Sequence, residues 1–147
     1  AMNPNATVES MKPIAEGQRA QMSGGGQSEA AMRQMLQMMI TDPADVDRAL
    51  ALSQKSDPAT VAQAMYELNT SDLRDAIAEI QAPTLVLGAW VAYQQFGSTK
   101  ESTAAIFDAQ YAKHPNYTLA MSDKGRHFIM WDDPEFFFSQ LDNLLEN

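Results

Sequence analysis

The sequence predicts an α/β fold in which a helical first half is followed by a strand–helix–strand–helix unit with two parallel strands. Three observations lead to this expectation. Apolar residues recur at helical spacing up to Ile80, a short continuous apolar run begins at Pro83, and a second strand candidate follows one amphipathic helix later. We therefore expect a helical segment over residues 1–80 and a sheet-forming segment over residues 81–147.

Start signals define the helices of the first half. Thr7 and Ser28 are N-cap candidates, because a hydroxyl can accept a hydrogen bond from the free backbone N–H groups of a first turn. Asp42-Pro43 and Asp57-Pro58 each combine an N-cap acceptor with proline at the first helical position. The helices are predicted over 7–22 with a kink at Pro13, and over 28–40, 43–54, 58–69 and 72–80. Ser23-Gly24-Gly25-Gly26 predicts a flexible hinge between the first two helices.

The second predicted helix has an apolar face rich in methionine. Met32, Met35, Leu36 and Met39 follow the spacing of one helix face. Such a stripe can simply pack against the next helix. Alternatively, its unbranched and adaptable side chains can line a pocket for a loosely defined apolar ligand.

The second half contains two strand candidates. Pro83 to Gly88 is a short apolar run, typical of a strand buried on both faces, and Tyr117 to Ser122 is the other. An amphipathic helix is predicted over 99–113, and Asp133-Pro134 opens a last helix with a broad apolar face. Two strands are too few to cover both of these helices. We therefore expect neighbouring strands in a segment that precedes this sequence.

The order of motifs in the second half resembles the α/β-hydrolase family. Ile80 to Gly88 reads IQAPTLVLG, Gly125-Arg126-His127-Phe128 follows the second strand, and the last helix begins at Asp133-Pro134 and ends with Leu144-Leu145. The resemblance is specific over residues 72–147 and only positional over 1–71. It implies a fragment of an α/β-hydrolase fold, in which residues 1–80 form a helical lid and 81–147 the C-terminal part of the core. It also implies that His127 acts as general base and then general acid toward a serine.

Two departures from the family's pattern concern its other catalytic groups. The Gly-x-Ser-x-Gly elbow is missing, since no two of the seven glycines lie four apart, so the nucleophile is expected in a preceding segment and this chain alone should be inactive. Val91 stands where the family commonly has its acid, and no carboxylate lies between Gly88 and Glu101. Either the acid comes from the end of the preceding strand, or the histidine is oriented in another way. Asp132 and Asp133 are nearer in sequence, but Asp133 is better explained as the N-cap of the last helix and Asp132 stays undecided.

Aromatic residues follow both strand ends. They could line a substrate site or seal the lid against the sheet, and we predict as substrate-binding Trp90, Tyr93, Phe128 and Trp131. Phe96 belongs to the same group of aromatic residues but is not among those predicted to bind substrate. His114, in Lys-His-Pro-Asn, is expected at the surface at the end of a helix.

The predicted substrate is an ester, lactone or amide of a small apolar molecule. A net charge of −9 disfavours nucleic acid and anionic membrane as partners. The spacing of the histidines and acids implies no metal or organic cofactor. The absence of cysteine leaves the compartment open, with the cytoplasm favoured. The expected partners are the missing N-terminal part of the same protein and a second copy bound through the exposed strand edge or the lid. The rival hypothesis is a noncatalytic, helix-rich binding or assembly module of hydrolase ancestry.

Overall fold

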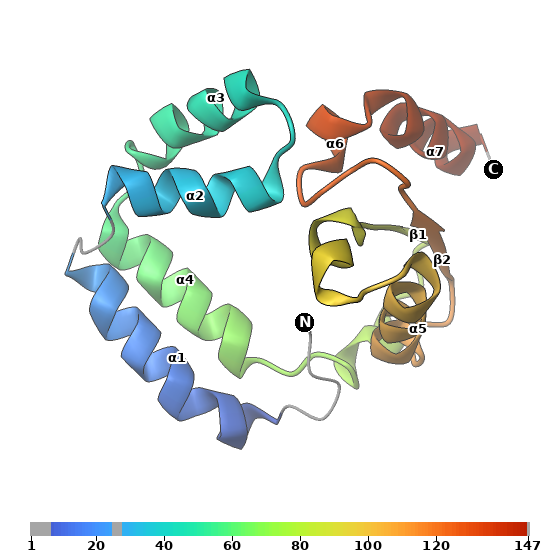
Figure 1. Ribbon diagram of the computed structural model, residues 1–147. Helices are drawn as coiled ribbons and strands as arrows, with labels where there is room; N and C mark the ends of the chain where they lie inside the picture. Colours follow the sequence, from blue (N-terminus) through green and yellow to red (C-terminus); the bar gives the residue numbers. More distant parts are fainter. Residues whose placement is uncertain (1–6, 25–27, 147) are drawn as a thin grey trace.

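The computed structural model of the chain describes residues 7–24 and 28–146, and it has the predicted α/β architecture (Figure 1). Four helices come first: α1 (Val8–Ser23), α2 (Glu29–Met39), α3 (Pro43–Ser53) and α4 (Pro58–Thr70). After them come the strand β1 (Thr84–Gly88), the helix α5 (Lys100–Tyr111) and the strand β2 (Tyr117–Met121). A short helix α6 (Ile129–Asp132) and the helix α7 (Pro134–Glu146) complete the described part.

The helix starts lie where the capping residues predict them. The hydroxyl of Thr7 accepts from Ser10 N in a capping box, and the hydroxyl of Ser28 accepts from Ala31 N. The carboxylates of Asp42 and Asp57 cap α3 and α4, each followed by proline. Pro13 lies inside α1 without ending it. Of the predicted hinge, Gly25 and Gly26 lie outside the described residues.

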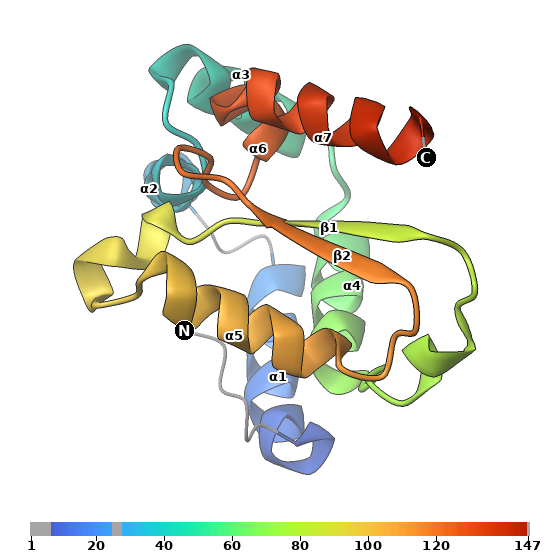
Figure 2. The same cartoon turned by 90° about the vertical axis from the view of Figure 1, so that its right-hand side faces the viewer.

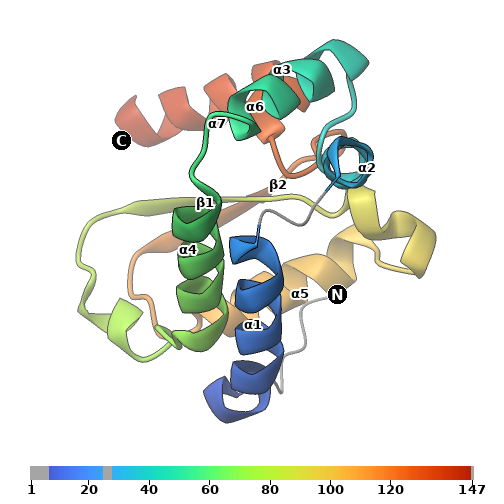
Figure 3. The ribbon, with the colours of Figure 1, turned by 90° about the vertical axis from the view of Figure 1, so that its left-hand side faces the viewer.

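Helices α1 and α4 lie side by side and form one arm of the helical part (Figures 1 and 3). Their contact contains two small, fully buried residues, Ala15 and Ala62, which let the two backbones approach closely. Arg19 of α1 lies over the ring of Tyr66, 4.4 Å from its centroid, and donates to Gln63 Oε1 over 3.1 Å. The charged head of Arg19 thus covers the edge of an otherwise apolar contact.

The strands β1 and β2 form a parallel pair with Val86 opposite Leu119. Helix α7 lies above this pair and α5 below it in Figure 2, and both contact β1. A Cβ atom on Gly88 would lie 2.2 Å from Met121 Sδ, so the absence of a side chain lets Met121 approach the end of β1. Within the described residues β1 pairs with β2 alone, which leaves its other edge without a neighbouring strand.

The structure differs from the sequence prediction in three short segments. The helix predicted over 72–80 is only a 3₁₀ turn, η1 (Ala76–Glu79). Arg74 N donates to Asp72 Oδ1, as Ala44 N does to Asp42 Oδ1 at the start of α3, so a capping bond is present although no α-helix follows it. The expected polar loop after β1 contains a 3₁₀ helix, η2 (Val91–Phe96), and the loop after β2 contains α6.

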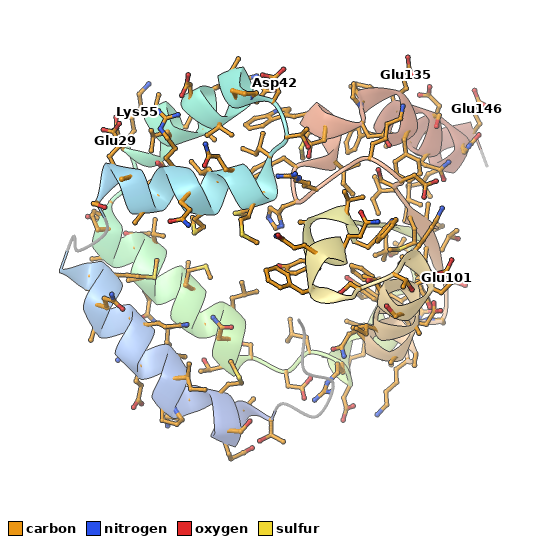
Figure 4. All side chains as sticks on the ribbon, in the orientation of Figure 1. Glu29, Asp42, Lys55, Glu101, Glu135 and Glu146 are labelled. Atoms are coloured by element: carbon orange, nitrogen blue, oxygen red, sulfur yellow. The ribbon has the colours of Figure 1, made fainter. Side chains whose placement is uncertain are left out.

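The main apolar cluster lies between α2 and α3 and extends to the loop after β2. Its buried members are Leu36, Ile40, Val46, Ala49 and Leu50. Phe128 and Trp131, which come from the second half of the chain, pack against this cluster together with Met32 and Met39. In Figure 4 the labelled charged residues, which include Glu29, Lys55 and Glu135, lie at the outer side of the molecule. None of the helices in residues 7–24 and 28–146 is long and apolar enough to span a bilayer.

Candidate active site around His127

Two buried polar side chains, Ser122 and Asp133, are hydrogen-bonded at the start of the loop that carries His127. Ser122, fully buried at the end of β2, donates from Oγ to Asp133 Oδ2 over 2.7 Å. The same Oγ accepts from Gly125 N at 2.7 Å and from Lys124 N at 3.2 Å. Asp133 was expected to cap α7 with its side chain. Its carbonyl oxygen does accept from Phe137 N, but its carboxylate is used to hold the turn after β2, which corrects that expectation.

A second set of hydrogen bonds joins this loop to helix α2 and to the residues just after it. Asp132 accepts from Arg126 N and from Thr41 N, one bond to each carboxylate oxygen and both 2.8 Å long. The Arg126 guanidinium donates to the carbonyl oxygens of Gln37 and Ile40 at the end of α2. The loop residues on either side of His127 are therefore tied to the carboxyl end of α2. Both oxygens of Asp132 have backbone partners, so the undecided Asp132 is a positioning group.

His127 is exposed and lies at the wall of a cavity of ≈710 Å³. The ring is held edge-on against Phe128, with centroids 5.1 Å apart. Opposite walls come from α2, through Met35, Met38 and Met39, and from α5, through Phe107. Two residues of the predicted methionine stripe, Met35 and Met39, line this cavity, and Met39 also packs on the buried cluster between α2 and α3. That the cavity takes an apolar ligand stays a prediction. Met38 and Phe107 had not been identified from the sequence. Met38 could have been, because it follows Met35 by three residues.

Neither ring nitrogen of His127 has a hydrogen-bond partner among the described residues. A base in acyl transfer needs one nitrogen facing the nucleophile and the other oriented by an acid. Ser98, in the loop before α5, also lines the cavity, but no hydrogen bond joins it to His127 within residues 7–24 and 28–146. His127 thus has a free imidazole beside an apolar space, while the groups that would complete a triad are not among its neighbours.

The other predicted site residues divide between this cavity and its surroundings. Tyr93 lines the His127 cavity, and Phe128 lines a second cavity of ≈370 Å³ that also has walls from α2. Trp131 lines neither and stacks on Phe128 with centroids 4.9 Å apart. Trp90 also lines neither, and its indole N–H is buried without an acceptor in the described part of the chain. Phe96 is largely exposed.

His114 was expected at the surface, and this expectation is wrong. The residue is 5% exposed. Its Nδ1 accepts from Asn116 N at 3.1 Å, so the proton is on Nε2, which donates to Thr84 Oγ1 at 3.0 Å. The ring ties the turn before β2 to the first residue of β1, which is a structural role.

No group of three or more His, Asp or Glu side chains in residues 7–24 and 28–146 is arranged to hold a metal ion. The resolved pKa shifts belong to residues away from the cavity. One example is Tyr117, whose pKa is raised by the hydrogen bond that it donates to Asp108. The candidate site is therefore defined by shape, apolar lining and one exposed imidazole.

Comparison with known proteins supports the fold. No protein-family profile matches the chain, and neither does any curated protein sequence. Among solved structures the chain is similar to MenH from S. aureus, an α/β-hydrolase-fold enzyme, with a TM-score of 0.65 at 14% sequence identity. The match covers 95% of this chain and 52% of the MenH chain, so this chain spans about half the length of that protein. The chain therefore has the fold of part of an α/β-hydrolase.

Proposed function

We propose that this chain is the lid and C-terminal core portion of a serine-type hydrolase acting on an ester, lactone or amide of a small apolar molecule. The observation that carries the proposal is the position of His127, exposed at the wall of a cavity whose other walls are mainly methionine, aromatic and aliphatic side chains. In this function His127 removes the proton of a serine hydroxyl and later returns it to the leaving group. Residues 1–80 are the lid and residues 81–147 the core portion.

The serine is supplied by a segment outside residues 1–147, and that segment is the partner for the free edge of β1. This assignment rests on the missing Gly-x-Ser-x-Gly elbow and on the edge of β1 that has no neighbouring strand in the described residues. Exposed backbone donors and acceptors on such an edge also favour pairing with a second copy of the chain. A mass measurement in solution, repeated over a range of concentrations, detects that competing assembly.

Labelling of the full-length parent with a serine-directed fluorophosphonate tests the catalytic role. The parent should be labelled, and His127→Ala should slow labelling by about a thousandfold, since the serine loses its base. Ser98→Ala is the matched control, because it changes a serine of the same cavity that lies at no strand-to-helix elbow, and it should leave labelling unchanged. The proposal fails if a folded parent is not labelled, or if Ser98→Ala alone abolishes labelling.

A second candidate function is a noncatalytic binding module that kept the fold. The observation in its favour is the absence of a hydrogen-bonded acid at His127 among the described residues, together with Val91 at the position where the family commonly has its acid. This function predicts a folded parent that binds apolar ligands in the same cavity and is not labelled by the fluorophosphonate.

A further inference from the structure

The cavity beside His127 adjoins a second apolar cavity that shares part of its lining on α2. This second cavity measures ≈370 Å³ and lies between α2 and the residues that end α3 and begin α4. Its walls include Met32 and Leu36 of α2, Val61 of α4 and the ring of Phe128. Among the residues that the structure describes, no charged side chain lines it. Of its two serines, Ser53 already donates its hydroxyl hydrogen to Leu50 O over 2.8 Å.

Two methionines are shared by both cavities. Met35 and Met39 line the His127 cavity and also line the second one, so their side chains form the partition between the two spaces. Phe128 lines the second cavity and is in ring contact with His127. The second cavity therefore begins within one residue of the candidate base.

Methionine side chains between the two cavities can move apart and let a ligand pass from one cavity to the other. Methionine is unbranched and has several rotatable bonds, so its side chain can move aside for a ligand where a β-branched residue would hold one position. Met35 is 44% exposed, which leaves its end free to move. A ligand that passes between these two side chains has to be narrow and apolar. The passage lies between methionine side chains, and no charged side chain among the described residues lines the second cavity.

From this geometry we infer that the site takes a substrate with an unbranched alkyl or acyl chain, which extends from His127 between Met35 and Met39 into the second cavity. A volume of ≈370 Å³ has room for a chain on the order of ten methylenes, if each takes about the ~30 Å³ of a water molecule. The inference narrows the substrate class of the proposed function and rests on it for the reaction at His127. Binding of the alkyl chain in the second cavity does not depend on catalysis.

Binding of two uncharged methyl ketones to the polypeptide of residues 1–147 tests this inference without any reaction. 2-Hexanone should reach only the His127 cavity, whereas 2-dodecanone should extend into the second. Each buried methylene contributes about 0.8 kcal/mol, so the longer ketone should bind about a hundredfold or more tightly even with incomplete burial. Methionine methyl resonances measured by NMR report where the ligand binds, and those of Met32, Met35 and Met39 should shift most with the longer ketone.

Val61→Trp should fill the second cavity, since Val61 lines it and is partly exposed. This variant should weaken 2-dodecanone at least tenfold and leave 2-hexanone unchanged. Leu68→Trp is the matched control on the same helix, because Leu68 is 71% exposed and lines neither cavity, and it should change neither affinity.

Three results would overturn the inference: equal affinities of the two ketones for the unmodified chain, equal losses for both in Val61→Trp, or the largest shifts at Met65 or Met130, which lie outside both cavities. A failure of the proposed function is recognised separately. In that case the longer ketone binds as expected while the full-length parent is not labelled by the fluorophosphonate.

Discussion

At the scale of single residues, Asp132 illustrates how one carboxylate sets the position of a loop. Each of its oxygens accepts from a backbone N–H group, one in the His127 loop and one just after the end of α2. Asp132→Asn replaces one acceptor by an NH₂ group that faces an N–H donor. We expect a loss of about 1–3 kcal/mol in the free energy of unfolding, and faster hydrogen exchange at the amides of Thr41 and Arg126.

Asp123→Asn is the control for this prediction. Asp123 is also close to His127 in sequence, but its exposed carboxylate pairs only with Lys100, and such a surface pair contributes about 0–1 kcal/mol. Equal effects of the two variants on stability and on amide exchange would contradict the positioning role of Asp132.

A second residue-scale prediction concerns the cap of α4. The pKa of Asp57 is lowered from 3.8 because the Thr60 hydroxyl donates a hydrogen bond to its carboxylate and Thr60 N donates another. A lowered pKa in the folded state means that the stabilisation is present above the pKa of the unfolded chain and is lost as the pH falls through the folded value. Thr60→Val should raise the pKa of Asp57 toward its ordinary value and reduce the loss of stability between pH 6 and pH 2.

NMR titration of the Asp57 carboxyl, and urea midpoints at the two pH values, measure this effect. Thr60→Ser keeps the hydroxyl and should keep the low pKa. An unchanged pKa in Thr60→Val would assign the shift to the backbone bond alone.

At the scale of elements, the helix starts were predictable because their causes are local. Thr7, Ser28, Asp42 and Asp57 cap helices through groups two or three residues away, and such contacts need no knowledge of the fold. At Asp72 the same kind of bond forms with Arg74 N, yet only the 3₁₀ turn η1 follows, so a capping residue alone was not enough to predict a helix over 72–80. The segment α6 was missed because Asp132 and Arg126 bind α2, which is distant in sequence.

The candidate site was predictable only in part for the same reason. A motif after the second strand was sufficient to select His127, and the spacing of α2 was sufficient to propose a methionine wall. Two other positions depend on contacts across the fold. Trp131 packs against the buried cluster between α2 and α3, and the buried His114 is hydrogen-bonded to Thr84 of β1. Periodicity and composition carry no information about such contacts.

Gly125 provides the prediction at the scale of elements, since it lies in the turn that joins β2 to α6. A Cβ atom there would lie 2.9 Å from Ser122 Oγ and 3.1 Å from Ile129 Cγ1, both of them buried. Gly125→Ala should therefore cost about 1–3 kcal/mol in the free energy of unfolding, as overpacking does in tight sites. It should also disturb the bond from Ser122 to Asp133.

Gly17→Ala is the matched control for this substitution. Gly17 lies inside α1 and a Cβ atom there meets nothing within 4 Å, so alanine should stabilise the chain by about 0.5–1 kcal/mol. Chemical denaturation of both variants checks the pair. If both substitutions increased the free energy of unfolding, the contacts at Gly125 would not be tight.

At the scale of the whole molecule, the division at residue 80 separates two segments by sequence and leaves them joined by packing. Phe128 and Trp131, from the second segment, pack on the α2–α3 cluster of the first, and Arg48 of α3 lies 5.0 Å from the ring centroid of Trp131. A cluster shared in this way couples the stability of the helices before η1 to that of the sheet. These helices are therefore expected to unfold together with the strands and the helices that follow them.

Trp131→Ala tests this coupling, because it removes a large side chain from the shared contact and should cost about 3 kcal/mol or more. It also leaves Trp90, next to β1, as the single tryptophan of the chain. The helical signal in circular dichroism and the fluorescence of Trp90 should then shift to lower denaturant by the same amount and stay coincident. Trp131→Phe keeps an aromatic ring against Phe128 and should shift both signals less. If the helical signal kept its original midpoint while the fluorescence of Trp90 moved, the helices before η1 and the strand-containing segment would be independent folding units. The contact of Phe128 and Trp131 with the α2–α3 cluster would then not be what holds α2 beside His127.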